Sequence, residues 1–550
     1  MENLFDRHRG LLEDALKALD ARGFWSPYPE APSGRIYGET ARADADAAFA
    51  SLCQSVFLLP GHPQTGTAGK EVSPFGPVLS ISYPTADVKT LIAASKAAAE
   101  GWAHSSPQSR VGLCLEVLAR LNRMSFLMAN AVMHTTGQAF AMAFQAGGPH
   151  AQDRGLEAVA TAYREMTRTP QSAIWEKPQG KAPSIVMEKH WRIVPRGISL
   201  VIGCNTFPTW NSYPGLFASL ATGNTVIAKP HPGAILPVAL TVRVIREVLA
   251  EQGYDPNVVL LAADEAGAEI TTDLARTPDV AIIDYTGSNA FADWLRTHAG
   301  HARLYTEEAG VNSIVISVTD DFAGMCANIA FSLSLYSGQM CTSPQDIFVP
   351  AAGIETNEGH KSFDDVANGI ATAIDALLFD PARAANICGT IANPATLARV
   401  KNARVLGRVV RDSAPAGEGR SASPLLIAVD ADATKAHESE CFGPVAFIVK
   451  VKNADAGIAA ASRLAREKGA ITAALYETDE ARILAAAEAF AQAGVNLSVN
   501  LIGGIFVNQS AAFSDFHVTG ANPAGNASLT DAAFVVERFR TVMWRRLKTA

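Results

Sequence analysis

The feature that most constrains this chain is an alternation of short apolar runs with helical stretches between residues 198 and 318. Four short apolar runs rich in β-forming residues occur in its first part: Ile198–Ile202, Thr225–Ala228, Val258–Ala262 and Val280–Tyr285. A segment with helical spacing, Val238–Leu249, separates two of them and is followed by Gly253. Uninterrupted apolar strands are typical of parallel sheets buried on both faces, and parallel neighbours need crossover connections. The alternation therefore predicts an α/β unit built on a parallel sheet.

The chain length indicates the number of structural units, and the net charge restricts the kinds of binding partner. The chain has 550 residues, which is more than one hydrophobic core usually supports, so two or three structural units are expected. A second α/β stretch begins near Ser313–Ile316 and contains a helical run, Cys326–Tyr336, and a short strand, Asp346–Val349. The 46 basic and 54 acidic residues give a net charge of −8, which argues against a general nucleic-acid binder or a protein of anionic membrane surfaces.

The first 70 residues are less informative. Their leucines form a helical stripe that is followed by several prolines: Leu4, Leu11, Leu12, Leu16 and Leu19, then Pro27, Pro29 and Pro32. We expect a helix that packs against the rest of the protein, followed by a loop. The alternative is an extension that covers a substrate or binds a partner.

The sequence carries no sign of export or membrane insertion. Its start lacks the basic-then-apolar order of a signal peptide, and no apolar run approaches the ~20 residues needed to span a bilayer. Its seven cysteines are scattered without CxxC pairing, which suits reduced thiols. We therefore expect a cytoplasmic protein without a metal site.

Two segments have the pattern of strands that no helix covers. Residues 174–195 contain two runs of mixed polarity separated by Pro178, Gly180 and Pro183, which predicts a hairpin. The C-terminal Val542-Met543-Trp544-Arg545-Arg546-Leu547 also combines apolar and charged residues. Exposed strand edges of this kind need a partner.

Cys341 is the candidate nucleophile. It lies in Tyr336-Ser337-Gly338-Gln339-Met340-Cys341-Thr342, on a glycine-containing loop where a thiol faces a cleft more readily than in a core. A thiolate is the reactive form, so the site must favour loss of the thiol proton. Two carboxylates, Glu307 and Glu308, lie upstream, and a carboxylate is able to activate water against a thioester.

Two further motifs lie where a parallel sheet binds nucleotides, and a third precedes a predicted strand. Thr225–Lys229 is a strand that ends in a lysine at the carboxyl edge of the sheet. Thr286-Gly287-Ser288-Asn289 ends another strand and opens a helix, whose free N–H groups favour a pyrophosphate. Glu440-Cys441-Phe442-Gly443-Pro444 precedes the predicted strand Val445–Val449. Each motif alone is weak.

Taken in this order, the motifs resemble the NAD(P)-dependent aldehyde dehydrogenase superfamily from about residue 70 to the C-terminus. Within it, the segment Val507–His517, the segment Asn205–Trp210 and the long N-terminal extension are similar to the phenylacetate-degradation (PaaN-type) enzymes. The resemblance implies an α/β fold with a Rossmann-like cofactor domain, an α/β catalytic domain and a small β oligomerisation element. It also implies a homodimer or homotetramer that acts on a small-molecule aldehyde.

The resemblance implies these boundaries: an N-terminal extension at 1–70, a cofactor-binding domain at 71–173 and 196–306, a catalytic domain at 307–535, and an oligomerisation element at 174–195 and 536–550.

The resemblance also implies the catalytic roles. Cys341 would attack the aldehyde, and Glu307 would activate the water that hydrolyses the thioester. Glu307 is preferred because Cys341 lies 34 residues after it, which is the family's separation, and Glu308 is expected to be a solvated surface charge. Asn205 would stabilise the oxyanion, but Thr206 separates it from the aromatic residue, so Thr206 or the Cys341 N–H is an alternative. His517 either touches substrate or is a hydrogen-bonded loop histidine.

For the cofactor, the resemblance places Lys229 at the adenosine ribose, Gly287 and Ser288 at the phosphates, Glu440 at the nicotinamide ribose and Phe442 near the ring. Pro232 stands where NAD-preferring relatives often carry a glutamate that repels a 2′-phosphate. We therefore expect NADP or NAD, with NADP used at least as well as NAD.

Two alternatives remain open. A CoA-acylating relative would transfer the acyl group to CoA instead of water, and the presence of Glu307 counts against it. A non-catalytic protein that keeps only the fold is disfavoured because Cys341, Glu307 and Glu440 are retained together. The sequence does not identify the aldehyde; a semialdehyde of aromatic catabolism, free or carried on CoA, is the candidate that the resemblance suggests.

Overall fold

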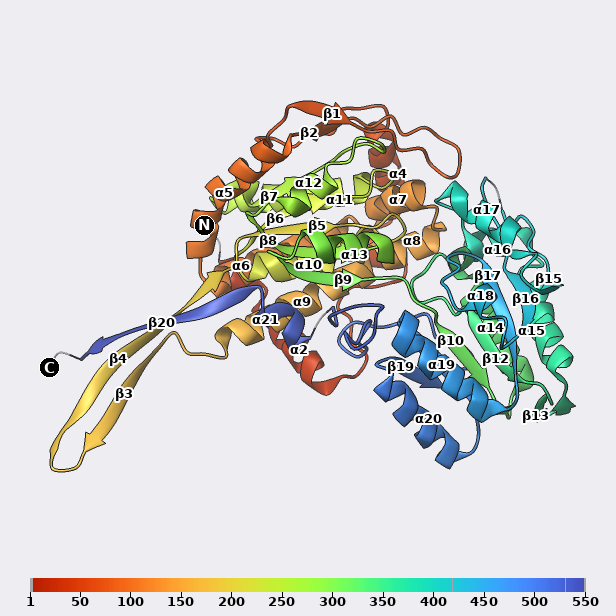
Figure 1. Cartoon of the computed structure of the whole chain (residues 1–550). Coiled ribbons are helices and arrows are strands. Elements are labelled where there is room, and N and C mark those ends of the chain that lie inside the picture. Colours follow the sequence, from red (N-terminus) through yellow and green to blue (C-terminus); the bar gives the residue numbers. More distant parts are fainter. Residues whose placement is uncertain (1–2, 418, 530, 549–550) are drawn as a thin grey trace.

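The computed structural model describes residues 3–417, 419–529 and 531–548. Two α/β units lie side by side, and a long β arm projects from the first of them (Figure 1). No helix within these residues is long and apolar enough to cross a bilayer. The α/β fold predicted from the alternation of strands and helices is confirmed.

The first unit is built on a five-stranded parallel sheet of order β7-β6-β5-β8-β9. Its strands are β5 (Ile198–Ile202), β6 (Thr225–Lys229), β7 (Val259–Leu261), β8 (Val280–Thr286) and β9 (Arg303–Glu307). The strand order reverses next to β5, because β6 and β8 pair with opposite edges of that strand. Ligands of open parallel sheets bind outside the carboxyl ends of the strands at such a point.

Helices cover both faces of this sheet because successive strand residues point in opposite directions. Val201 and Val226 belong to a hydrophobic core that also contains residues of four helices: α6 (Pro107–Arg123), α9 (Pro149–Thr167), α10 (Ser212–Ala221) and α11 (Leu236–Glu251). Leu200 and Ile227 join a second core with α5 (Val88–His104), α12 (Thr271–Arg276) and α13 (Asn289–His298). Two further helices, α7 (Ser125–Thr136) and α8 (Phe140–Gly147), extend the first core.

The second unit contains a seven-stranded sheet of order β15-β16-β17-β12-β10-β18-β19. Its strands are β10 (Ser313–Ile316), β12 (Asp346–Pro350), β15 (Arg408–Arg411), β16 (Leu425–Asp430), β17 (Val445–Val451), β18 (Thr472–Tyr476) and β19 (Asn496–Val499). All its neighbours are parallel except β15, which runs antiparallel to β16. The covering helices are α14 (Phe322–Ser334), α15 (Phe363–Leu377), α17 (Pro394–Ala403), α19 (Ala454–Lys468) and α20 (Glu480–Gln492).

The N-terminal residues form the expected packing helix. It is divided into α1 (Leu4–Arg7) and α2 (Arg9–Ala21), with Leu12 and Leu19 buried in the core that includes α9. After α2 the chain reaches the region of Phe513, whose ring meets the edge of Trp25 at a centroid distance of 4.8 Å. The N-terminal segment therefore lies against the long loop that carries His517.

The β arm is a three-stranded antiparallel sheet of order β20-β4-β3. Its strands are β3 (Ser172–Gln179), β4 (Ala182–Pro195) and β20 (Phe539–Leu547), so the predicted hairpin and C-terminal strand pair with each other. The arm projects into solvent (Figure 1), and Ile174, Val542 and Trp544 on it are exposed. Its outer strands, β3 and β20, leave apolar side chains and open edges without a partner in one chain.

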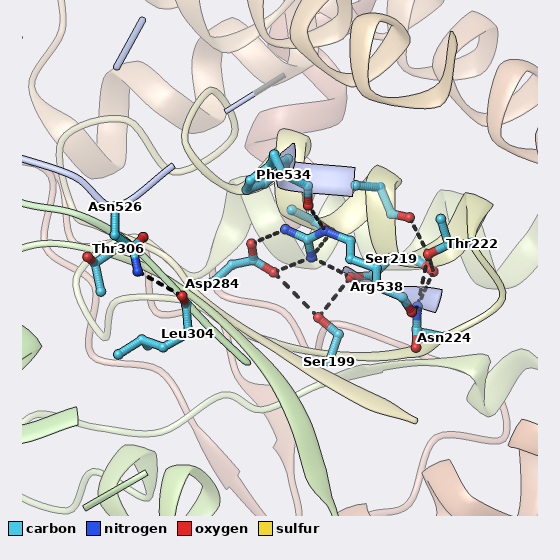
Figure 2. Close-up of polar contacts among 12 residues, drawn as sticks. Ser199, Ser219, Thr222, Asn224, Asp284, Leu304, Thr306, Asn526, Phe534 and Arg538 are labelled. Carbon is cyan, nitrogen blue, oxygen red and sulfur yellow. Dashed lines mark hydrogen bonds and ion pairs between the residues drawn. The ribbon is translucent and has the colours of Figure 1, made fainter. Parts of the chain in front are cut away.

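A buried ion pair fixes the root of the arm to the first sheet (Figure 2). The Arg538 guanidinium donates to both carboxylate oxygens of Asp284 on β8, over 2.8 Å and 2.5 Å. It also donates to Ser219 Oγ on α10 over 2.8 Å, and Asn224 donates to the Arg538 carbonyl over 3.0 Å. Arg538 is fully buried, so these bonds replace the water that its charge loses.

Candidate active site

A cavity of about 990 Å³ lies between the two units and brings most of the predicted site residues together. Lys229, Gly287, Ser288 and Glu307 line it from the first sheet. Cys341, Glu440 and Phe442 line it from the second unit. Residues separated by more than two hundred positions thus share one cleft, with a volume at the upper end of the range for ligand pockets.

Cys341 follows a tightly turned segment at the end of α14. The prediction that the helix continues to Tyr336 is wrong: α14 ends at Ser334, and Tyr336, Ser337 and Gly338 have φ values of 50°, 50° and 62°. Left-handed backbone is unfavourable for the first two residues, so the surroundings must hold them in place. Tyr336 Oη donates to the Thr136 carbonyl, and Ser337 Oγ donates to two carbonyls.

Close backbone packing fixes the rest of this loop. A Cβ at Gly338 would lie 2.5 Å from the Gly443 carbonyl oxygen, so only glycine fits there. Asn312 Nδ2 donates to the Cys341 carbonyl over 2.8 Å, and its Oδ1 accepts from the N–H of Ile471 over 2.9 Å. Asn312 was not singled out in the sequence, yet it ties the nucleophile loop to the neighbouring strand β18.

Glu307, at the end of β9, is the carboxylate that reaches Cys341. The Cys341 sulfur, one Glu307 oxygen and one His517 nitrogen all lie within 4.8 Å of one another. His517 Nε2 is 3.0 Å from Glu307 Oε1, and Asn211 Nδ2 donates to Oε2 over 2.9 Å. Burial opposes ionisation of Glu307, but contacts with His517, Cys341 and Asn211 outweigh it and lower the pKa of the carboxyl.

The pKa of the Cys341 thiol is shifted in the opposite direction. Burial and the neighbouring Glu307 raise the pKa of Cys341 well above its ordinary value. Cys341 therefore carries its proton in this arrangement, and Glu307 is in place to accept it.

The expectation that Glu308 is a solvated surface charge is wrong. Its side chain is buried and forms an ion pair with Arg296 on α13. The next residue along a strand end points away from its predecessor, so Glu307 and Glu308 reach different partners. The pairing with Arg296 leaves Glu307 as the carboxylate beside the thiol.

The end of the cavity at Lys229 contains acidic residues that the sequence motif did not show. Lys229 Nζ lies 2.8 Å from Asp264, which follows β7, and both side chains are buried. Glu269 from the same connection lines the cavity and interacts electrostatically with Lys229 and His231. The absence of an acid at Pro232 is therefore offset by carboxylates from another segment.

The helix that starts after Gly287 offers a site for phosphates. Ser288 is the N-cap of α13 and makes no side-chain capping bond, so N–H groups of the first turn are available. Gly287 is held by its N–H to the Glu307 carbonyl over 3.1 Å, and a Cβ there would lie 2.4 Å from Tyr285 Oη. Free donors and close backbone approach fit a pyrophosphate.

The other end of the cavity carries Glu440 and Phe442. Glu440 keeps an exposed side chain, but the surrounding protein desolvates its carboxyl and raises the pKa to about 7. Arg399, whose guanidinium donates to the Phe442 carbonyl, partly opposes this shift. A carboxylate beside an aromatic ring, close to the nucleophile, fits a ribose and a nicotinamide ring. The cavity as a whole therefore fits NAD or NADP.

Asn205 lines the same cavity as Cys341. Its Oδ1 is buried without a hydrogen-bond partner among the described residues and lies 3.0 Å from where a Cβ of Gly233 would be. Asn211, which was not singled out, contacts Glu307 instead. Asn211 could have been identified from the sequence, because Asn211-Ser212-Tyr213-Pro214 repeats the Asn–x–aromatic–Pro pattern that begins at Asn205.

His517 is a hydrogen-bonded loop histidine beside Glu307 and Cys341, as one of the two alternatives from the sequence predicted. It is buried on the loop between β19 and β20, and its ring meets Trp210 edge-on at 4.5 Å. Its Nε2 lies 3.7 Å from Cys341 Sγ as well as 3.0 Å from Glu307.

Comparisons with known proteins agree with this geometry. A family model described as the aldehyde dehydrogenase family matches residues 74–515. The crystal structure of an NAD-dependent aldehyde dehydrogenase from Burkholderia multivorans is 52% identical, covers 100% of both chains and superposes with a TM-score of 0.98. A 1-pyrroline-5-carboxylate dehydrogenase from Thermus with bound NAD is 19% identical over 96% of this chain and 99% of its own, with a TM-score of 0.73, and shares the fold.

Two curated relatives are more distant in sequence. The 1-pyrroline-5-carboxylate dehydrogenase of Bacillus subtilis is 24% identical over 77% of this chain and 79% of its own length. The N-succinylglutamate 5-semialdehyde dehydrogenase of Burkholderia ambifaria is 27% identical over 68% of this chain and 74% of its own.

Proposed function

The chain belongs to the aldehyde dehydrogenase family, and we propose that it oxidises an aldehyde to the carboxylic acid through Cys341 and Glu307. The observation that carries this proposal is the position of the Glu307 carboxylate within 4.8 Å of the Cys341 sulfur, at the end of a cavity that fits a dinucleotide. A nucleophile with an adjacent base is the arrangement that covalent catalysis requires.

The reaction follows from these positions. Glu307 accepts the thiol proton, and Cys341 Sγ attacks the aldehyde carbon to form a thiohemiacetal. NAD or NADP, when bound, accepts the hydride that leaves this carbon. Cys341 then holds the product as a thioester, and Glu307 gives the proton that it took from the thiol to solvent. The ionised Glu307 takes a proton from the water that attacks the thioester and returns this proton to the Cys341 sulfur as the acid is released, so that the thiol is restored. Asn205, Thr206 or the Cys341 N–H is proposed to stabilise the oxyanion.

Hydrolysis is favoured over transfer to CoA because of the surroundings of Glu307. Hydrogen bonds from His517 and Asn211 keep its carboxyl ionised, and an ionised carboxylate is the form that deprotonates water. The products of a steady-state reaction decide between the two: free acid supports the proposal, and an acyl-CoA formed only when CoA is present supports the CoA-acylating alternative.

We propose NAD as the preferred cofactor, in place of the NADP preference expected from Pro232. Asp264 neutralises Lys229, and Glu269 adds negative charge to the same end of the cavity, where a 2′-phosphate would lie. Like charges repel such a phosphate. The relative from Burkholderia multivorans, described as NAD-dependent, supports the same choice.

The test is the ratio of kcat/KM for NAD to that for NADP. We expect the wild type to favour NAD and Glu269→Gln to raise NADP use several-fold with little change for NAD. A wild type that favours NADP would contradict the proposal.

For the substrate, we propose a semialdehyde. The resemblance to phenylacetate-degradation enzymes makes a semialdehyde of aromatic catabolism, free or CoA-linked, one of the substrates to be tested. The names of the two curated relatives add N-succinylglutamate 5-semialdehyde and 1-pyrroline-5-carboxylate. Steady-state oxidation of this panel beside simple aliphatic and aromatic aldehydes identifies the class by its kcat/KM; a best substrate with no second functional group would contradict it.

We further propose that the boundaries at 1–70, 71–173 with 196–306, and 307–535 delimit the extension, cofactor and catalytic regions. The arm, residues 174–195 with 536–550, is proposed to join two or four copies of the chain, supported by its exposed apolar side chains and open edges.

A further inference from the structure

His517 occupies a position that the reaction described above does not use. Its Nε2 lies between the base and the nucleophile, 3.0 Å from Glu307 Oε1 and 3.7 Å from Cys341 Sγ. One ring nitrogen therefore faces both groups that exchange the thiol proton. Hydrogen bonds to sulfur are longer than those to oxygen, so the second distance is within reach of a weak bond.

The partners of the ring indicate which nitrogen carries hydrogen. An ionised Glu307 only accepts hydrogen bonds, so its contact with His517 requires a proton on Nε2. Nδ1 is buried and has no partner among the described residues. A second proton there would be a buried donor left unpaired, which is unfavourable. The contacts thus fit a neutral imidazole with its N–H at Nε2.

The backbone around His517 prevents the ring from swinging away. Arg154 donates to the Asp515 carbonyl over 3.2 Å, and Asn496 donates to the Phe516 carbonyl over 2.8 Å. The following residue, Val518, is buried against the same small core that Cys341 touches. Trp210 packs edge-on against the ring itself. The donor is therefore held in place before any substrate arrives.

The other ionisable groups around the thiol all disfavour a thiolate. Glu307 contacts the sulfur directly, and Cys204 and Glu440 act on it from farther away; each becomes negative when ionised. Against these groups, His517 places a ring nitrogen 3.7 Å from the sulfur.

We propose that His517 is a catalytic residue that donates its Nε2–H to the Cys341 thiolate and so stabilises the nucleophile. The role rests on the proposed function of Cys341. As the thiol proton passes to Glu307, that carboxyl becomes neutral and a weaker acceptor, while the sulfur becomes an anion and a stronger one. The Nε2–H then turns its bond from Glu307 to the sulfur, and no bond within the imidazole breaks. When the thioester is hydrolysed and Glu307 returns the proton, the bond turns back.

The test measures the thiolate without any aldehyde. The enzyme is treated with iodoacetamide over a range of pH, and the rate at which Cys341 is alkylated is followed by mass spectrometry of the peptide that contains it. His517→Phe keeps a ring against Trp210 but removes the donor. We expect its midpoint of alkylation to lie about one to two pH units above that of the wild type, the size expected for one hydrogen bond to a charged group.

His517→Gln is the matched control, because its amide places an N–H close to the position of Nε2. We expect its midpoint to stay within about half a unit of the wild type, with the donor retained. Thermal unfolding and cofactor binding verify that each variant is folded; if His517→Phe is not, His517→Asn, whose amide is too short to reach the sulfur, replaces it.

Two results would overturn this role. An unchanged midpoint in the variant without a donor shows that His517 does not stabilise the thiolate. A Gln variant whose midpoint rises as far as that of the Phe variant shows that an N–H restored near the position of Nε2 does not stabilise it either. Failure of the proposed function is distinguishable, because Cys341→Ala would then keep aldehyde oxidation whatever the alkylation profile.

Discussion

Cofactor binding by this enzyme should depend on pH through Glu440. This side chain lines the cavity where the nicotinamide ribose is proposed to bind, and desolvation by the surrounding protein raises its pKa to about 7. The carboxyl is therefore mostly neutral below pH 7 and mostly ionised above it. An ionised carboxylate accepts hydrogen bonds from both ribose hydroxyls, whereas a neutral carboxyl keeps a proton that competes with them. Binding should strengthen as pH rises.

The pKa sets the size of the effect. With a midpoint near 7, about one tenth of Glu440 is ionised at pH 6 and about nine tenths at pH 8. The Kd for the dinucleotide should thus fall about tenfold between these values, with about half a proton released per cofactor bound at pH 7. Fluorescence titration with the reduced cofactor gives the Kd, and calorimetry in two buffers of different ionisation enthalpy counts the proton.

Glu440→Gln separates this effect from other titrations in the cavity. His231 lines the same cavity, but desolvation by the surrounding protein and the charge of Lys229 lower its pKa to about 4, so it is neutral throughout the range. The variant should bind with a Kd that is nearly constant from pH 6 to 8. A wild-type Kd that changes less than twofold, or an equal slope in the variant, would refute the reasoning.

Three further predictions concern the nucleophile, the arm and its root. Cys341→Ala should abolish aldehyde oxidation, followed as reduced cofactor, while the cofactor Kd changes less than about twofold, since only the covalent step is lost; retained turnover would exclude Cys341 as nucleophile. Light scattering at micromolar concentration should give two or four times the 58.0 kDa chain mass, because β3 and β20 leave apolar edges open, and a monomer would contradict this. Arg538→Met should leave the Asp284 charge buried and unpaired, destabilising the fold by about 3–5 kcal/mol; the midpoint of thermal unfolding should fall, and adding Asp284→Asn should restore part of it.

Much of the fold was predictable because the strands of the first sheet are buried on both faces. Segments such as Ile198–Ile202 are apolar except for one small residue, Ser199, and the structure places that strand at the same residues. The end of α14 was not predictable from periodicity. Ser337 and its neighbour Tyr336 carry no sequence signal for a left-handed turn, and their conformation depends on distant carbonyls that accept their hydroxyl groups.

The site was predictable where a motif lies on one element, and less so where two segments meet. Glu307 lies at a strand end at the family's spacing from Cys341, and the structure brings the two together. His517 comes from a long loop without regular structure, 210 positions from its partner Glu307 in the chain. Glu308 was misjudged because its partner Arg296 lies on the preceding helix, and a pairing of that kind has no local sequence signature.

The most direct test of the account is a rapid-mixing measurement of reduced cofactor with Glu307→Gln. Glutamine keeps the shape of the side chain but cannot take a proton from water. Loss of the Glu307 charge also removes one of the causes that raise the pKa of Cys341, so the thiol loses its proton to solvent more readily, and the thioester should form and then persist. The account predicts a burst of reduced cofactor approaching one equivalent per active site, followed by turnover slowed by about 10²–10⁴-fold. Glu308→Gln, in which only the ion pair with Arg296 is lost, should show no such burst. Steady turnover at the wild-type rate in Glu307→Gln, or a burst in Glu308→Gln alone, would contradict it.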